Sequence, residues 1–223
     1  MARARRGVVA AGGGGPVVVV GLTGGIASGK STAAAALQAC GAPVVRSDAL
    51  AREVVAPGTR ALAEIRAAFG PQVLAPDGTL ARRVLAERIF ADPAARRRLE
   101  EITHPRIHRR MLRWLQERRG EGAPAAVCDI PLLFEAGYDR RGGFLDRIWV
   151  VRVDAETQLR RLMARDGLDP AAAAARLAAQ WPLEAKAARA QLVLENAGSP
   201  EELAAVAQHA WRRLRQELGL ADA

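Results

Sequence analysis

The chain has 223 residues, of which half are hydrophobic but only nine are aromatic (four Trp, four Phe, one Tyr), and its 33 basic and 24 acidic side chains give a formal charge of +9. Its longest apolar runs fall short of the roughly 20 residues that cross a bilayer, which argues against a membrane protein. The basic surface attracts polyanions, but so few aromatic side chains make a base-stacking platform improbable, and nucleic acid is not expected as a partner.

Residues 1–15, MARARRGVVAAGGGG, are expected to form a flexible tail. Glycines interrupt its apolar stretch before signal-peptide length is reached, although Arg5 and Arg6 leave an export signal or an organelle transit peptide as alternatives. Cys40 and Cys128 lack the spacing of a disulfide or zinc motif, so we expect buried, reduced thiols in a cytoplasmic protein.

The first elements follow directly. Residues 16–23, PVVVVGLT, form a β-branched run that ends in glycines, which predicts a buried strand. A helix is expected to begin inside GKST and to continue to Ala39, because Gly41 and Pro43 follow. Residues 43–48 predict a second strand that ends in a polar cluster.

A helical excursion is expected between about residues 59 and 119, with helix starts at Thr79 and at Asp92-Pro93. The rest of the chain alternates between strands (125–130, 146–153, 191–196) and helices (154–165, 169–180, and one that begins with the capping sequence Ser199 to Glu202). This alternation predicts an α/β fold with a doubly wound parallel sheet, into which the helical excursion is inserted.

The segment Gly24 to Ser31 fits the pattern G-x-x-x-x-G-K-[ST] and lies between a strand and a helix, as a phosphate-binding loop must. Its backbone N–H groups and the helix N-terminus would bind the phosphates of ATP. Lys30 would reach the β- and γ-phosphates, and the Ser31 hydroxyl would bind Mg²⁺. The residues expected to bind ATP are Gly24, Gly25, Ile26, Ala27, Ser28, Gly29, Lys30, Ser31 and Thr32.

Two carboxylates are expected where strands end, the edge at which an open α/β sheet binds ligands. Asp48, after the second strand, could accept a proton from an acceptor hydroxyl or help to hold a metal; the alternative is a helix N-cap. Asp129, after an apolar strand, fits a metal-associated acid or a turn residue equally well.

Arginines gather on the two helices that precede Gln180. Arg161 and Arg165 are four residues apart and share one helical face, with Arg160 and Arg176 nearby. They could neutralise charge on a phosphoryl group during transfer, or form a solvated basic face.

The histidines and tryptophans carry weaker signals. His104 precedes Pro105, which predicts a break between helical stretches there and leaves a structural or a catalytic role open. His108 and His209 are expected at the surface, and the four tryptophans in packing.

Several strings follow one another in the order of a known family: GLTGGIASGKST, SDALAREVVAPG, FG with DGTLARRVLAERIF, THP, DIPLLFEAG, RLMARDG, Gln180 with Lys186, and LENAG. From about Val17 to near its C-terminus the chain therefore resembles the dephospho-coenzyme A kinases. The resemblance implies a P-loop kinase that uses ATP to phosphorylate the ribose 3′-hydroxyl of dephospho-coenzyme A, the last step of coenzyme A synthesis.

The resemblance also implies three parts: a nucleotide-binding core (16–57, 121–159, 189–220), a helical coenzyme-binding region (58–120) and a lid (160–188). Asp48, Lys30, Arg161 and Arg165 match catalytic positions. Substrate contacts are implied for Arg52, His104, Glu135, Gln180 and Lys186. The chain departs from the family's usual D-x-D at Arg46, which stands where the first acid is common.

Two other functions remain as rivals: a P-loop kinase for a nucleoside or nucleotide, and a nucleotide-dependent switch or nucleic-acid-binding ATPase. The rival kinase would not need a helical excursion that accommodates a long pantetheine arm. A switch would retain its product and turn over slowly.

Overall fold

The computed structural model describes residues 17–140 and 143–220. Its elements are, in chain order, β1 (Val18–Gly24), α1 (Lys30–Ala39), β2 (Val44–Arg46), α2 (Ser47–Glu53), α3 (Arg60–Phe69), the 3₁₀ helix η1 (Pro71–Val73), α4 (Arg82–Ala91), α5 (Pro93–Gly120), β3 (Ala125–Asp129), β4 (Arg147–Arg152), α6 (Ala155–Asp166), α7 (Pro170–Ala178), α8 (Leu183–Ala187), β5 (Leu192–Glu195) and α9 (Pro200–Glu217). The expected tail, residues 1–15, lies outside the described residues. Within the described ranges no helix combines the length and the apolar character that a membrane span requires.

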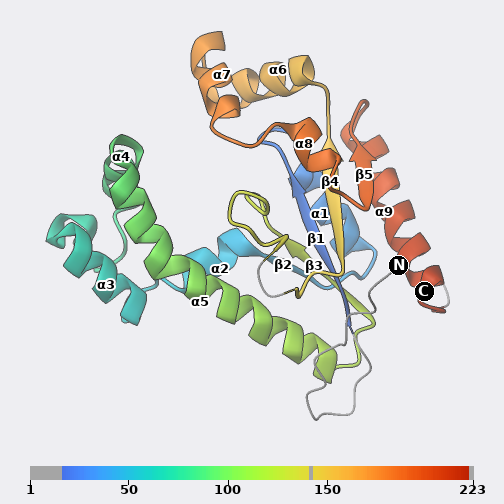
Figure 1. Ribbon diagram of the computed structural model, residues 1–223, viewed down its shortest axis with the longest axis horizontal. Coiled ribbons are helices and arrows are strands. Elements are labelled where there is room, and N and C mark those ends of the chain that lie inside the picture. Colours follow the sequence, from blue (N-terminus) through green and yellow to red (C-terminus); the bar gives the residue numbers. More distant parts are fainter. Residues whose placement is uncertain (1–16, 141–142, 221–223) are drawn as a thin grey trace. The chain divides into compact units, whose positions relative to one another are not determined.

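The strands form one five-stranded sheet in the order β2-β3-β1-β4-β5, with β1 at its centre (Figure 1). The β1–β3, β1–β4 and β4–β5 pairs are parallel, and Leu22 lies opposite both Asp129 and Trp149. Strands buried on both faces are expected to be continuously apolar, which explains the run of valines in β1. The parallel α/β sheet predicted from the sequence is confirmed.

The main core lies between the sheet and the helices α1 and α9. It joins apolar side chains of the strands, such as Leu22 and Trp149, to Leu37 of α1 and Trp211 of α9. Burial of each such side chain stabilises the fold by about 1.5–3 kcal/mol. Trp149 and Trp211 therefore serve packing, as expected.

The start of α9 is also as predicted. The Ser199 hydroxyl accepts a hydrogen bond from the Glu202 N–H, and the Glu202 carboxylate accepts one from the Ser199 N–H. This reciprocal cap satisfies two N–H groups that the helix leaves without intrahelical partners.

The described chain divides into two compact units. One comprises the sheet with α1 and α6 to α9, and the other is Arg46–Trp114. The second unit has its own apolar cluster, in which Ile65, Phe69 and Val73 pack with Leu85 and Ile102. The helical excursion predicted from the sequence is confirmed, and its own core explains why it can fold as an insertion.

Two local expectations about element boundaries were wrong. The second strand ends at Arg46, so Asp48 lies in the first turn of α2 and not at a strand end. Helix α4 begins at Arg82, because Thr79 instead donates both its N–H and its hydroxyl to the Asp77 carboxylate in a turn. Such local bonding of Asp and Thr competes with helix formation.

The predicted break at His104 is also wrong, since α5 runs through Pro105 without interruption. The Ile102 carbonyl accepts a hydrogen bond of 2.5 Å from the Arg106 side chain. Ile102, Ile107 and Met111 are buried on the same helix, so tertiary packing outweighs the local preference of the residue before proline.

The cysteines and histidines differ partly from expectation. Both Cys40 and Cys128 are free, but only Cys128 is buried, and its burial raises the pKa of its thiol. Cys128 is therefore a protonated, inert packing residue. His209 is exposed as predicted, whereas His108 is half-buried.

Candidate active site

The phosphate-loop motif lies between the buried strand β1 and helix α1. Gly29 adopts a φ of 93° directly before the helix, and its carbonyl accepts the N–H groups of Thr32 and Ala33. No acidic side chain lies in the first turn of α1. The helix N-terminus therefore presents N–H groups and positive potential without a competing carboxylate, as anion binding requires.

Lys30 forms an ion pair with Asp129, the last residue of β3. The Lys30 Nζ atom bonds Oδ1 of Asp129, and the side chains are only 15% and 6% exposed. The sequence had left Asp129 as a metal-associated acid or a turn residue. The structure adds a third interpretation, in which the Asp129 carboxylate orients the lysine of the loop.

Three amide side chains from distant segments bond the backbone of the loop. Gln180 Oε1 accepts from the Ile26 N–H at 2.9 Å, and Gln158 Nε2 donates to the Ile26 carbonyl at 2.7 Å. Asn196 Nδ2 donates to the Ser28 carbonyl at 2.8 Å. Only Gln180 was among the expected site residues.

Lys186 and Glu135 form a second buried pair behind the loop. Lys186 is fully buried, and its Nζ atom lies 2.7 Å from Glu135 Oε1 and 3.5 Å from the Gly24 carbonyl. Glu135 Oε1 also accepts the Trp181 N–H at 3.0 Å. The pair therefore joins the strand end at Gly24 to the segment that carries Gln180.

Trp181 lies in a small stack beside this pair. Its ring lies parallel to that of Phe134, at a centroid distance of 6.0 Å, and the Arg189 guanidinium lies 4.8 Å from the Trp181 ring centroid. Trp181 therefore serves packing, and cation–π contact adds to it.

Two glycines of the loop leave room for the amide side chains. A Cβ atom at Gly25 would lie 2.3 Å from Gln158 Nε2, and one at Gly29 would lie 2.3 Å from Asn196 Nδ2. The general motif leaves the position of Gly25 free. A glycine at a position where the motif accepts any residue was therefore a sequence signal that a side chain, here that of Gln158, approaches the loop closely.

The arginines of α6 and α7 have different partners. Arg161 donates to the Gly198 carbonyl at 3.2 Å. Arg165 bonds Asp166 at 2.8 Å, and Arg176 bonds the same carboxylate at 2.7 Å. The hydrogen bond from Arg165 is the main cause that lowers the pKa of Asp166, so this carboxylate is ionised at neutral pH.

Three expected site residues belong to the second unit, Arg46–Trp114. Asp48 and Arg52 are exposed on α2, at its first and last turn, and His104 is half-buried within α5. Helix α2 has no side-chain cap, and its N-cap position is Arg46. Asp48 is therefore not the N-cap that the alternative interpretation required.

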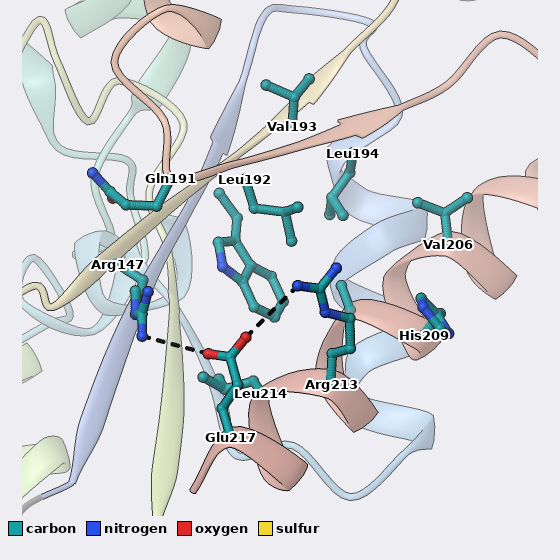
Figure 2. A pocket seen from close by; sticks show the side chains of 12 residues that line it. Arg147, Gln191, Leu192, Val193, Leu194, Val206, His209, Arg213, Leu214 and Glu217 are labelled. Atoms are coloured by element: carbon teal, nitrogen blue, oxygen red, sulfur yellow. Dashed lines mark hydrogen bonds and ion pairs between the residues drawn. The ribbon is translucent and has the colours of Figure 1, made fainter.

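A pocket of 170 Å³ lies elsewhere, between the edge strand β5 and α9 (Figure 2). Glu217 contacts both arginines of this pocket, Arg147 at 3.5 Å and Arg213 at 3.9 Å. The pocket contains no residue of the phosphate loop. We therefore place the reaction at the loop.

The donor set of the loop fits a divalent cation that is held mostly by phosphate oxygens. In residues 17–140 and 143–220 no group of three or more His, Cys, Asp or Glu side chains could form a metal cage. Ser31 is exposed in the first turn of α1 and could supply its hydroxyl. Mg²⁺ usually takes few protein ligands when it binds with a nucleotide.

A parallel sheet, a phosphate loop after its central strand and a lysine at the head of α1 together define a P-loop nucleotide-binding protein. The family model of dephospho-CoA kinase matches residues 18–202. Similar proteins include the dephospho-CoA kinases of Anaeromyxobacter dehalogenans, 55% identical over 88% of this chain and 92% of that protein, and of Geobacter sulfurreducens, 53% identical over 87% and 97%. The chain belongs to the dephospho-CoA kinase family.

Solved structures agree. A protein of Thermus thermophilus is 38% identical, with a TM-score of 0.73 over 91% of this chain and 98% of that one. The dephospho-CoA kinase of Campylobacter jejuni is 27% identical, with a TM-score of 0.68 over 89% and 98%. The enzyme is accordingly a transferase that phosphorylates an alcohol group, in the final step of coenzyme A biosynthesis.

Proposed function

We propose that this chain works in the cytoplasm and transfers the γ-phosphate of ATP to the ribose 3′-hydroxyl of dephospho-coenzyme A, with Mg²⁺ as the metal. The observation that carries the proposal is the family match, which runs from β1 into α9 and so includes the phosphate loop and the helical unit. We keep the division into a core (16–57, 121–159, 189–220), a helical coenzyme-binding region (58–120) and a lid (160–188).

The phosphate loop, Gly24 to Thr32, binds the phosphates of ATP. Its N–H groups and the N-terminus of α1 hold the anion, and Lys30 supplies a positive charge to the β- and γ-phosphates. Asp129 supports this role, because it holds the ammonium of Lys30 before nucleotide binds. Bound Mg²⁺ would supply charge neutralisation between the phosphates, with the Ser31 hydroxyl as its ligand from the protein.

The second unit, Arg46–Trp114, binds the acceptor and supplies the base that removes its proton. Asp48 is the catalytic base that accepts the proton of the hydroxyl, and its exposure on α2 leaves the carboxylate open to a ligand. Arg52 and His104 are coenzyme contacts in this proposal, since both can bond phosphate or ribose oxygens. We also keep Glu135, Gln180 and Lys186 as substrate-binding residues. Gln180 and Lys186 bond the backbone of the phosphate loop, and Glu135 pairs with Lys186.

The arginines of the lid stabilise the charge on the transferring group. Arg161 bonds the Gly198 carbonyl, two residues beyond Asn196, which itself holds the loop at Ser28. Arg165 is bonded to its neighbour Asp166 inside the lid. These contacts favour Arg161 as the more important of the two.

Arg161→Ala should therefore lower kcat by about 10–100-fold, because a fixed charge acts on the transition state more than on bound ATP. Arg165→Ala should lower kcat less. Arg160→Ala is the matched control, since Arg160 is exposed on the same helix and interacts with Thr157, at 3.5 Å, and with Asp154. Steady-state kinetics of the three variants check this order, and normal turnover of both Arg161→Ala and Arg165→Ala would show that these arginines form a solvated face.

Dephospho-coenzyme A should give faster ATP turnover than any nucleoside, nucleotide or nucleic acid. The physical reason is that parts of dephospho-coenzyme A far from the reacting hydroxyl can contact the helical unit. The binding energy of these contacts orients the hydroxyl for transfer and so raises turnover. The assay measures ADP release with each acceptor and with none, and mass spectrometry with NMR locates the new phosphate.

Each rival predicts a different result in that assay. A nucleoside or nucleotide kinase would prefer its own acceptor, and a switch or nucleic-acid-dependent ATPase would release ADP without an acceptor or only with nucleic acid. Phosphate on an atom other than the ribose 3′-oxygen would contradict the proposed reaction.

A further inference from the structure

Ile26 of the phosphate loop is held on both sides by side chains, one of which lies just before the proposed lid (160–188) and the other within it. The Ile26 N–H donates to Gln180, which follows α7, and the Ile26 carbonyl accepts from Gln158, in the first turns of α6. Gln158 is 7% exposed, so its amide is committed to this contact. Neither glutamine is needed for a generic phosphate loop.

Ala27, the residue that follows Ile26, has an unfavourable backbone conformation. Ala27 has a φ of 58° and is the one non-glycine residue with positive φ in the described part of the chain. A side chain disfavours this left-handed conformation, which persists only where the surroundings hold it. The bonds that hold this stretch are the two at Ile26, the turn bond from the Ser28 N–H to the Gly25 carbonyl and the bond from Asn196 to the Ser28 carbonyl.

The same pattern continues along the loop. The carbonyls of Gly24, Ile26 and Ser28 accept bonds from Lys186, Gln158 and Asn196 respectively. Carbonyl oxygens repel phosphate, so bonding alternate carbonyls to protein side chains keeps them from facing the anion. The glycines at 25 and 29 leave the space that two of these side chains occupy.

We propose that Gln158 and Gln180 are positioning residues for ATP, an inference that rests on the proposed function of the loop. They hold the backbone of Ile26 on both sides, and with it the left-handed Ala27, before the nucleotide arrives. Because the binding conformation is then already populated, ATP binds without first reorganising the loop. The two glutamines act through the backbone and contact no reacting atom.

Gln158→Met and Gln180→Met remove the amide with little change in side-chain length. Each should raise the Kd of ATP about fivefold to tenfold, the effect of one hydrogen bond, and should change kcat at saturating ATP less. Gln116→Met is the control, since Gln116 is an exposed glutamine on α5. Isothermal titration with ATP and Mg²⁺ gives Kd, and thermal melting reports whether each variant is folded.

The Ala27→Gly substitution separates positioning from a general loss of stability. Glycine adopts positive φ without penalty, so the loop no longer needs the glutamines to keep its shape. In the Ala27→Gly background each Gln→Met change should raise Kd less than about twofold. An equal rise in both backgrounds, or an unchanged Kd in the single variants, would overturn the proposal.

Two charged variants provide a further check if a Met variant does not fold. Gln180→Glu keeps an acceptor for the Ile26 N–H, whereas Gln158→Glu loses the donor to the Ile26 carbonyl. Both add one negative charge beside the same residue, Ile26, so Gln158→Glu should weaken ATP binding more, and equal effects would overturn the proposal. Failure of the proposed function itself would appear in the unmodified enzyme, as absent ATP binding or absent coenzyme A formation.

Discussion

Lys30→Met should lower kcat by about 10²–10³-fold. This is the usual effect of removing one preorganised positive charge that stabilises the negative charge on the transferring phosphoryl group. Methionine keeps the length of the side chain and removes its ammonium. ATP should still bind, though more weakly, because the loop amides and Ser31 remain. Steady-state kinetics with dephospho-coenzyme A give kcat, and titration gives the ATP affinity.

This variant needs a control, because Lys30 also compensates a buried carboxylate. Asp129 is 6% exposed and pairs with Lys30, so loss of the ammonium alone can lower the free energy of unfolding by as much as about 3–5 kcal/mol. The double variant Lys30→Met with Asp129→Asn removes both charges. It should recover most of the melting temperature and almost none of kcat.

The two measurements then separate the roles of Lys30. A double variant that regains both stability and turnover would show that Lys30 acts only as the partner of Asp129. A single variant with normal turnover would show that Gly24 to Ser31 is not the site of phosphate transfer.

The sequence predicts those features of the fold that depend on local patterns. The valines of β1 and the G-x-x-x-x-G-K-[ST] pattern place the phosphate loop correctly between a strand and a helix. The capping sequence at Ser199 likewise places the start of α9. Each of these features is determined by residues within a few positions of one another, where steric and hydrogen-bond preferences act directly.

Features that depend on distant partners could not be read in this way. Gln158 and Asn196 bond the loop across 132 and 168 positions of sequence, and no local spacing marks them. The short helix α8, Leu183–Ala187, likewise depends on distant partners. It carries Lys186, whose buried ammonium bonds Glu135 and the Gly24 carbonyl. Helix α5 shows the opposite case, in which packing by the rest of the unit overrides the local signal at Pro105.

Asp48→Asn should lower kcat by about 10²–10⁴-fold, the range of general-base catalysis, and the lower part of that range is expected. The substitution keeps the shape of the side chain and removes its ability to accept a proton. A loose phosphoryl-transfer transition state requires little deprotonation before the new bond forms, which limits the effect. Arg46 stands two residues earlier, so no adjacent carboxylate in this segment is available to take over the proton.

The position of Asp48 on α2 makes the experiment easy to interpret. Asp48 is exposed and is not the N-cap of its helix, so Asp48→Asn should leave the melting temperature almost unchanged. Glu201→Gln, at an exposed acid in the first turn of α9, is the matched control for the loss of one charge at a helix start. ATP affinity of Asp48→Asn should stay near that of the unmodified enzyme, because Lys30 and the loop amides hold the nucleotide. A near-normal kcat would remove Asp48 from the reaction, and a loss of ATP binding that more Mg²⁺ restores would assign its carboxylate to the metal instead.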